Sequence, residues 1–445
     1  MSSPAKVLAI NFGGIGDEVL FLPTLERIKE LAPDCELTLL VEPRSKSVME
    51  VTNLIDKIIT FDIKKKPLTL VDLIRLTMLL RTGGYDMVIS SGSSPMVAML
   101  LFLSGIKLRV GYDSGSPVKS LLTHPVKLVR EQYAADMYHD LTKGMANYLR
   151  RKADANASIR DVDHTYQVPK VTLKAESLAA MKAFLEEGLR ATQNAVTTDD
   201  TKPADISQID TRPVKTVLIH PGTSQMAVSK GIIKHWSSEN WLTFIRLLQN
   251  QKDQPFQTRV ILCGGPDDKE VVAGLERLLK ADSGQGKNGS SASAAPYISA
   301  VGKTKGLADL AALTSLCDVL VCVDSAPMHI GVGLNKNLVA LFGPTDPKLL
   351  IPNQKNFKVL ADRPEYAHSN GVVSAKSPAN GISPAPASAV ASAPASSASV
   401  ATASAATASV ATAPPRTLQD GLGVRLHPES VYQSLLDLLR AESNQ

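Results

Sequence analysis

Apolar and polar positions along the first half of the chain follow two alternating periods. Short apolar runs, typical of strands buried on both faces, alternate with longer amphipathic segments typical of helices. The pattern predicts four strands, at residues 7–11, 37–41, 57–61 and 87–90. It also predicts three helices, at residues 18–31, 45–54 and 70–81. This alternation indicates right-handed βαβ units and an α/β fold with a parallel sheet covered on both faces.

The second half repeats the alternation. Strands are predicted at 216–219, 259–263, 297–301, 319–323 and 337–342, and helices at 238–249, 268–281, 307–317 and 328–333. Residues 191–213 are polar, carry two prolines and show no apolar period, which favours a linker. We therefore expect two Rossmann-like domains, at residues 1–190 and 214–368.

Two later segments differ in composition. Residues 282–295 are expected to be flexible, and residues 369–420 to form a low-complexity, disordered insert. Between Lys376 and Arg416 that insert is rich in Ala, Ser, Thr, Pro and Val and has no charge, so it cannot bury enough side chain to offset its ordering entropy. The final segment, 421–445, contains an amphipathic helix predicted at 428–440.

The bulk composition limits the class of protein. The 445 residues are 44% apolar, with no stretch long enough to span a bilayer, which favours a soluble cytoplasmic protein. Cys35, Cys263, Cys317 and Cys322 lie in or beside apolar runs without metal-ligand spacing, so we expect buried, reduced thiols. A net charge of +5 with only 4% aromatic residues argues against a nucleic-acid partner.

Basic residues are concentrated in the first half. They form either a solvated face or a surface that attracts an anionic substrate or membrane. The residues are Lys64, Lys65, Lys66, Lys107, Arg109, Lys119, Lys127 and Arg130.

The stretch NFGGIGDEVLFLP follows the first predicted strand and suggests a phosphate loop. Gly14 and Gly16 match half of the dinucleotide motif G-x-G-x-x-G, but Val19 stands at its third glycine. Glu42, after the second strand, would suit a ribose. Asp17 in the first helical turn would repel a pyrophosphate, so a dinucleotide site is the weaker alternative.

A second candidate site follows the strand at 319–323. Asp324 or Ser325 is predicted to cap the next helix, and the backbone amides at its start would attract an anion. His329 would project near the same end, and Gly343 and Thr345 lie in the turn after the next strand. The alternatives are a cap without ligand contact and a half-buried packing histidine.

The loop HPGTS, after the strand at 216–219, offers Thr223 and Ser224, and Lys230 and Lys234 follow. Hydroxyls and a lysine suit a phosphate, although either lysine alone could be an ordinary surface residue. Since parallel strands end at one sheet edge, this loop and Asp324 are expected to meet.

Five segments together resemble glycosyltransferase family 9, the ADP-heptose:lipopolysaccharide heptosyltransferase family. They are GGIGDEVLFLPTL, HPGTS with KHW, LADLAALTSLCDVLVCVDSAPMHIGVGL, LFGPTDP and the helix after HPES. The resemblance implies a GT-B fold, in which two Rossmann-like domains face a cleft and hold the acceptor and the nucleotide-sugar. It also implies metal-independent, inverting transfer from a nucleoside diphosphate sugar such as ADP-heptose, without a cofactor, to a lipopolysaccharide-type or other glycan acceptor.

The resemblance also assigns roles. Asp17 matches the general base, with Gly14 and Gly16 on the acceptor side. The donor side comprises Thr223, Ser224, Lys234, Asp324, Ser325, Ala326, His329, Gly343 and Thr345, and among these Lys234 is expected to stabilise the leaving diphosphate.

The sequence departs from the family's pattern in three places, and these differences do not specify the sugar or the base of the donor. Ala326 stands where a glycine is frequent, the insert replaces a loop that carries cysteines in many relatives, and the piece between HPGTS and KHW is longer. A nucleotide-sugar epimerase of GT-B fold and a non-catalytic nucleotide- or glycan-binding protein are the alternatives. The expected partners are an anionic glycan or glycolipid acceptor and, at the periphery, the inner face of the membrane.

Overall fold

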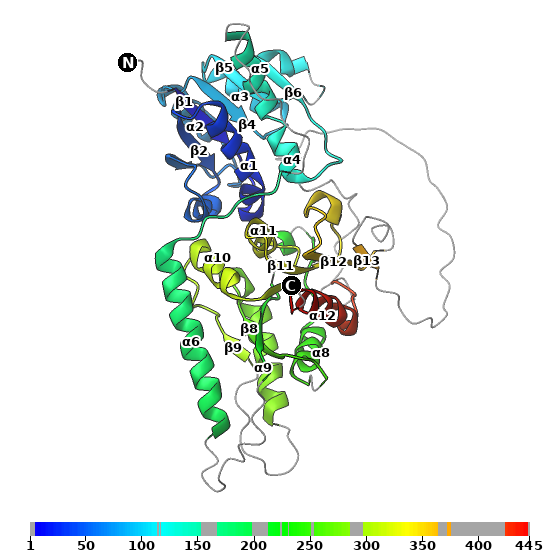
Figure 1. The fold of residues 1–445 in the computed structure, drawn as a ribbon. Coiled ribbons are helices and arrows are strands. Elements are labelled where there is room, and N and C mark those ends of the chain that lie inside the picture. The colour runs from blue at the N-terminus through cyan, green and yellow to red at the C-terminus, as the bar shows by residue number, and fades with distance from the viewer. Residues whose placement is uncertain are drawn as a thin grey trace, which may run out of the picture.

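A computed structural model describes most of the chain as two lobes, each built on a parallel sheet (Figure 1). The expected pair of Rossmann-like domains is confirmed. The segments predicted as flexible and disordered fall largely outside the described residues. Those residues are 5–113, 115, 117–152, 167–197, 212–222, 225–229, 231–250, 253–284, 297–363, 372–374 and 423–443.

The N-terminal lobe contains a six-stranded sheet in the order β3-β2-β1-β4-β5-β6. Every neighbouring pair is parallel, and the four strands predicted from apolar runs are all present. Both faces of the central strands are buried, which explains why these segments are continuously apolar. The strands are β1 (Lys6–Ile10), β2 (Glu36–Val41), β3 (Lys57–Thr60), β4 (Met87–Ser90), β5 (Leu108–Asp113) and β6 (His124–Lys127).

Helices cover both faces of this sheet. One apolar cluster joins the sheet to α1, α4 and α5, and a second joins the opposite face to α2 and α3. The α-helix predicted at 45–54 is wrong: Pro43 starts a 3-10 helix there, and the Ser45 hydroxyl is bonded to Gly13 O instead (3.0 Å). The helices are α1 (Ile15–Leu31), η1 (Pro43–Val51), α2 (Leu70–Thr82), α3 (Pro95–Leu103), η2 (Pro117–Leu121), α4 (Ala134–His139) and α5 (Thr142–Lys152).

The C-terminal lobe contains a seven-stranded parallel sheet in the order β13-β12-β11-β10-β7-β8-β9. Strand β13 pairs with β12, so the sheet extends into the beginning of the segment expected to be disordered. The strands are β7 (Val214–His220), β8 (Gln257–Leu262), β9 (Tyr297–Ser299), β10 (Val319–Val323), β11 (Asn337–Phe342), β12 (Phe357–Ala361) and β13 (Val372–Ser374).

The helices of this lobe include one that the sequence placed in the first domain. Helix α6 continues past residue 191, into the expected linker, and buries Met181 and Leu185 in the second lobe's core beside α10. The helices are α6 (Ala175–Thr197), α7 (Gln225–Ser229), α8 (Ser238–Gln249), η4 (Pro266–Asp268), α9 (Lys269–Gly284), α10 (Leu307–Leu316), α11 (Ala326–Gly333), η5 (Pro347–Leu349) and α12 (Pro428–Ser443).

The C-terminal helix α12 completes the second lobe. Its buried Leu435 and Leu439 join the core that contains Trp236 and Trp241, and the Trp236 indole donates to Leu426 O at 2.9 Å. All four cysteines of the chain are buried and unpaired, as expected. None of the helices in the described part of the chain has the length and apolar character needed to cross a membrane.

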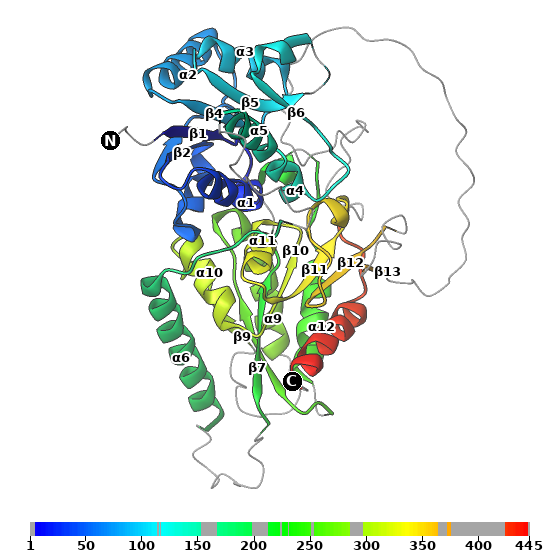
Figure 2. The ribbon, with the colours of Figure 1, turned by 45° about the horizontal axis from the view of Figure 1, so that its top comes forward.

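The lobes meet through helices that follow strands of the two sheets. Helix α1 packs against α11, and η1 against α10, as the two views in Figures 1 and 2 show. Ile330 of α11 belongs to the N-terminal lobe's core cluster. The Glu50 carboxylate accepts a hydrogen bond from the Ala308 N–H group (3.1 Å), so a side chain of one lobe satisfies a helix N-terminus of the other.

Candidate active site

The junction between β1 and α1 positions Asp17. Gly14 adopts the extended N-cap conformation, and its N–H group donates to Asp17 Oδ2 at 2.8 Å, an arrangement typical of a capping box. The Tyr138 hydroxyl on α4 donates to Asp17 Oδ1 at 3.2 Å. A neighbouring backbone group and a side chain from the distant helix α4 therefore orient the half-buried Asp17 carboxylate at the carboxyl end of the sheet.

Asn11 and Ser91 fix the strand ends beside Asp17. The Ser91 hydroxyl donates to Asn11 Oδ1 (2.5 Å), and the Asn11 amide donates to the backbone oxygen of Asp17 (3.4 Å). This network links β1 to β4 beneath the loop. Sequence reasoning missed Asn11, Ser91 and Tyr138, because no local motif marks a residue that acts through a partner roughly 80 or more positions away.

Glu18, the neighbour of Asp17, is buried, and neither of its carboxylate oxygens has a well-formed hydrogen bond. Burial, together with the adjacent charge of Asp17, raises the pKa of Glu18 well above its usual value. Nearby Asn11 and Lys64 oppose this shift without reversing it. The first turn of α1 thus holds two carboxyl groups in very different surroundings.

Asp324 lies at the carboxyl end of β10 and binds two groups from neighbouring loops. Its Oδ2 accepts from Lys234 Nζ and from the Thr345 hydroxyl, each at 2.6 Å. Burial by itself would raise the pKa of Asp324, but the ion pair and the hydrogen bonds outweigh burial and lower it. Asp324 is therefore an ionised anchor that holds Lys234 and Thr345 together.

Neither predicted helix cap forms at α11. The Ser325 side chain makes no capping bond and instead donates to Val323 O (3.1 Å), while Asp324 is occupied by Lys234. The first turn of α11 contains no acidic residue, and no described residue accepts a hydrogen bond from the Ala326 N–H group. This helix start therefore presents a positive dipole end beside Lys234.

His329 connects the two junctions. It is buried rather than half-buried, its Nδ1 atom has no hydrogen-bond partner among the described residues, and burial lowers its pKa although Asp324 and Asp17 oppose that shift. A methyl group added at Gly16 would lie only 2.7 Å from His329 Cδ2. The α1 and α11 starts are therefore in direct contact, which places Asp17 close to the Asp324 and Lys234 pair.

The end of β7 lies beside the end of β10, as expected for parallel strands. His220 is in register with Cys322, so Gly222 follows at the same sheet edge as Asp324. The predicted phosphate ligands Thr223 and Ser224, and Lys230, lie outside the described residues. Gly343 follows β11 close to the backbone of Ile233, next to Lys234, and Thr345 is bonded to Asp324.

Glu42, the residue that could have bound a ribose, is engaged in ion pairs. Its carboxylate contacts Arg44 at 2.5 Å and Lys64 at 3.2 Å. In the part of the chain that the structure describes, no group of three His, Cys, Asp or Glu side chains is arranged to hold a metal ion.

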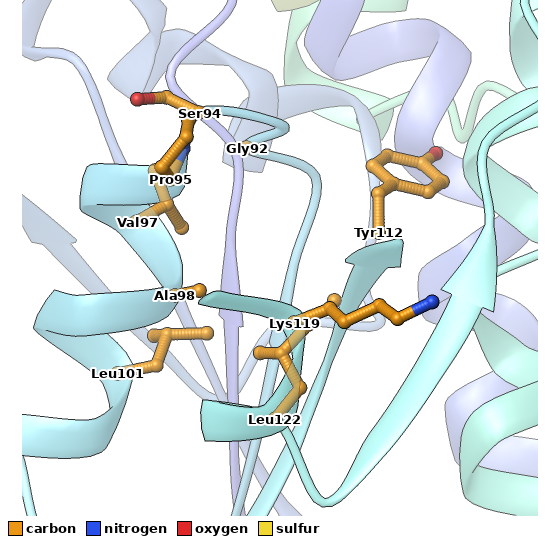
Figure 3. A pocket seen from close by; sticks show the side chains of 10 residues that line it. Gly92, Ser94, Pro95, Val97, Ala98, Leu101, Tyr112, Lys119 and Leu122 are labelled. Carbon is orange, nitrogen blue, oxygen red and sulfur yellow. The ribbon is translucent and has the colours of Figure 1, made fainter. Parts of the chain in front are cut away.

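A small pocket lies elsewhere in the N-terminal lobe, between α3, β5 and η2 (Figure 3). Its lining includes Ser94, Val97, Tyr112 and Lys119, and Figure 3 shows Tyr112 across the pocket from Ser94. Neither Asp17 nor the Lys234 and Asp324 pair lines it, so it is distinct from the candidate site. The Tyr112 hydroxyl is already bonded to Met137 O (2.7 Å).

The fold of the chain is similar to folds of known proteins. Among solved structures, the chain is similar to E. coli ADP-heptose lps heptosyltransferase II, with 16% identity, coverage of 98% of this chain and 99% of that one, and a TM-score of 0.60. It is also similar to the glycosyl transferase family 9 protein from Veillonella parvula DSM 2008, with 21% identity, 81% and 87% coverage and a TM-score of 0.57. No match was found among curated proteins.

The solved structures establish the GT-B fold, and a family comparison adds the activity class. The family model described as glycosyltransferase family 9 (heptosyltransferase) matches residues 73–376, more than half of the chain. The chain therefore belongs to glycosyltransferase family 9 and is a glycosyltransferase.

Proposed function

We propose that the protein transfers a heptose or similar sugar from a nucleoside diphosphate sugar to a lipopolysaccharide-type glycan acceptor, with inversion and without a metal ion. The observation that carries the proposal is the contact between Gly16 and His329, which brings a carboxylate of one lobe to a lysine and an uncapped helix start of the other. An inverting displacement needs a base on the acceptor side and positive charge beside the leaving group.

In this reaction Asp17 is the general base. It takes the proton from an acceptor hydroxyl while that oxygen attacks the anomeric carbon on the face opposite the diphosphate. The bond between that carbon and the phosphate oxygen breaks, and the electron pair leaves with the nucleoside diphosphate. The hydrogen bonds from Gly14 and Tyr138 hold the carboxylate in one orientation for this transfer.

On the donor side, Lys234 and the amide at the start of α11 stabilise the departing diphosphate. Lys234 has three N–H donors, and the contact with Asp324 uses one of them, so the others remain able to reach a phosphate. Thr223 and Ser224, which follow β7 in the sequence, complete this side in the proposal. ADP-heptose is the first donor to test, because it appears in the name of a similar E. coli enzyme.

The test measures nucleoside diphosphate release from ADP-heptose and other nucleotide-sugars, with and without a heptose-deficient lipopolysaccharide core acceptor, in EDTA. Acceptor-dependent release in EDTA and a product of inverted anomeric configuration, assigned by NMR, are expected. Epimerised donor without acceptor consumption would identify an epimerase instead. Strict dependence on Mg²⁺ or retained configuration would refute the mechanism.

A further inference from the structure

Two helices of the N-terminal lobe expose an unusual apolar surface. In the described part of the chain, seven of ten exposed large apolar side chains lie on α2 and α3, and these seven are between 47% and 73% exposed. We call this surface the α2–α3 face, defined by Leu70, Val71, Ile74, Met78, Met99, Phe102 and Leu103. A concentration of this kind on a folded protein marks an interaction site.

The exposed side chains of this face lie on two neighbouring helices. On α2 its residues recur at the spacing of one helical side, while the opposite side, with Leu76 and Leu80, is buried in the core. Helices α2 and α3 contact each other, and the Arg81 guanidinium reaches Leu103 O (3.5 Å) between them. Figure 2 shows both helices at the end of the molecule far from the C-terminal lobe.

The border of this face is strongly cationic. Residues 63–112 contain seven Lys and Arg side chains against two Asp, and Asp62 and Asp113 stand directly outside this range. Of the exposed basic residues, Arg75 and Arg81 lie on α2, Lys65 and Lys66 precede α2, and Lys107 follows α3.

The two acidic residues within this range are both engaged. Asp72 accepts hydrogen bonds from the Thr69 N–H group (3.0 Å) and hydroxyl (2.6 Å) and faces Lys65, and Asp86 accepts from the Lys6 N–H group (2.8 Å). The Arg109 guanidinium lies over the Phe102 ring, 5.6 Å from its centre, at the edge of the apolar face. Glu42 pairs with Lys64, and Asp72 lies near Lys65 and Arg75, so these acids offset part of the charge. The partner therefore meets apolar side chains bordered by an excess of basic residues.

We propose that the α2–α3 face docks on an anionic phospholipid bilayer, with its aliphatic, methionine and phenylalanine side chains inserted shallowly and its basic residues at the headgroups. Amphipathic helices bind membranes in this way, by apolar burial together with attraction to anionic lipid. A protein partner is less suited, because the face has no tryptophan or tyrosine among its defining residues, the types that dominate protein interfaces.

The start of α3 connects the docked face to the catalytic edge of the lobe. Helix α3 begins just after the loop that contains Ser91, and Ser91 is bonded to Asn11 beside Asp17. If the proposed function holds, docking would hold the enzyme on the same surface that carries a lipid-linked acceptor. Membrane binding itself does not depend on that reaction.

The test is flotation of the full-length protein with phosphatidylcholine vesicles, with and without about 30% phosphatidylglycerol. Binding to the anionic vesicles is expected, with weak binding to neutral ones and a loss of binding as salt increases. The double variant Ile74→Ser, Phe102→Ser should bind at least about 30-fold more weakly, since two inserted side chains are lost.

Two further variants separate the apolar and charge contributions. Lys66→Gln with Lys107→Gln should weaken binding to anionic vesicles about tenfold and leave neutral vesicles unaffected. Val214→Ser removes an equally exposed apolar side chain from the C-terminal lobe and should change nothing. Undiminished binding by both double variants, or no binding by the wild type, would overturn the proposal.

A second copy of the chain is the competing occupant of this face. A wild-type dimer that the Ile74→Ser, Phe102→Ser variant converts to a monomer, without vesicle binding, would overturn the membrane proposal in favour of self-association. Because flotation needs no turnover, its result is independent of whether the proposed sugar transfer is found.

Discussion

The two junctions that meet at the candidate site have the same backbone plan and opposite charge. In each, a buried parallel strand runs into the first turn of a helix, β1 into α1 and β10 into α11. Helix α1 carries Asp17 and Glu18 in its first turn, whereas α11 carries no acid there. The acid of the second junction, Asp324, stands before the helix and is paired with Lys234.

This difference shows that a strand–helix junction does not by itself define a phosphate site. At α1 the carboxylate of Asp17 accepts a hydrogen bond from the Gly14 N–H group at the start of the helix. At α11 the carboxylate is withdrawn to position a lysine, so the positive helix end stays available to an external anion. In the proposed function, the position of one carboxylate distinguishes the junction that accepts a proton from the one that binds a phosphate.

The largest expected effect tests the acidic junction. Asp17→Asn should lower kcat by roughly 100- to 10,000-fold, the usual worth of a positioned base, while an asparagine oxygen can still accept from Gly14 N–H. Steady-state turnover and thermal unfolding are the measurements. Glu26→Gln, a carboxylate elsewhere on α1, is the matched control and should be near wild type. Near-normal turnover of Asp17→Asn would remove this residue from the mechanism.

The next prediction concerns Lys234, the basic residue at the junction of β10 and α11. Lys234→Met should reduce kcat/KM for the donor by about 30- to 1,000-fold, because a contact to the leaving group is lost. It would also leave Asp324 buried and unpaired, which is strongly destabilising. The double variant with Asp324→Asn should regain stability without regaining activity. Recovery of activity in the double variant would show that Lys234 only neutralises Asp324.

Making α11 resemble α1 provides a direct test of the charge difference. Ala326→Asp places a carboxylate in the first turn of α11 and should weaken donor binding on the order of 100-fold, since like charges about 4 Å apart repel by several kcal/mol near a protein surface. Ala326→Asn has nearly the same shape without the charge and should lose only a few-fold. Equal losses in the two variants, measured by calorimetric titration of donor, would indicate a steric effect.

A smaller effect is expected from Thr345. Thr345→Val removes a 2.6 Å hydrogen bond to the charged Asp324 and should lower the free energy of unfolding by about 2 kcal/mol, with a similar loss in donor binding. Thr345→Ser retains the hydroxyl and should restore most of both. Chemical denaturation and donor titration measure the two quantities. A serine variant as impaired as the valine variant would shift the cause to the lost methyl group.

The smallest effect concerns the pH dependence of stability at Glu18. Because its folded-state pKa is raised well above the usual value, its stability contribution is fully present below about pH 4.5 and is lost as pH rises through the folded-state pKa. Glu18→Gln should therefore flatten the decline in unfolding free energy between pH 5 and pH 8, measured by denaturant titration at about six pH values. An identical slope in both proteins would mean that Glu18 ionises readily in the fold.

Much of this architecture could be predicted from the chain alone. Apolar runs and helical periods located the two parallel sheets, and the acid and lysine positions pointed to the ends of β1, β7 and β10. These features depend on neighbours within about four residues, so they are visible in the sequence. The same local reasoning failed at η1 and at the α11 cap, where distant groups bind Ser45 and Asp324 instead.

Only the tertiary structure decided which distant residues meet. The sheet order brings Tyr138 to Asp17 and Ser91 to Asn11, and lobe packing brings His329 to Gly16. Helices α2 and α3 are apolar on both sides, so their periodicity does not show which side the sheet buries. The sequence determined the elements through local periods and backbone hydrogen bonds. The site and the exposed face depend on contacts between residues tens to hundreds of positions apart, and chain order alone does not specify those contacts.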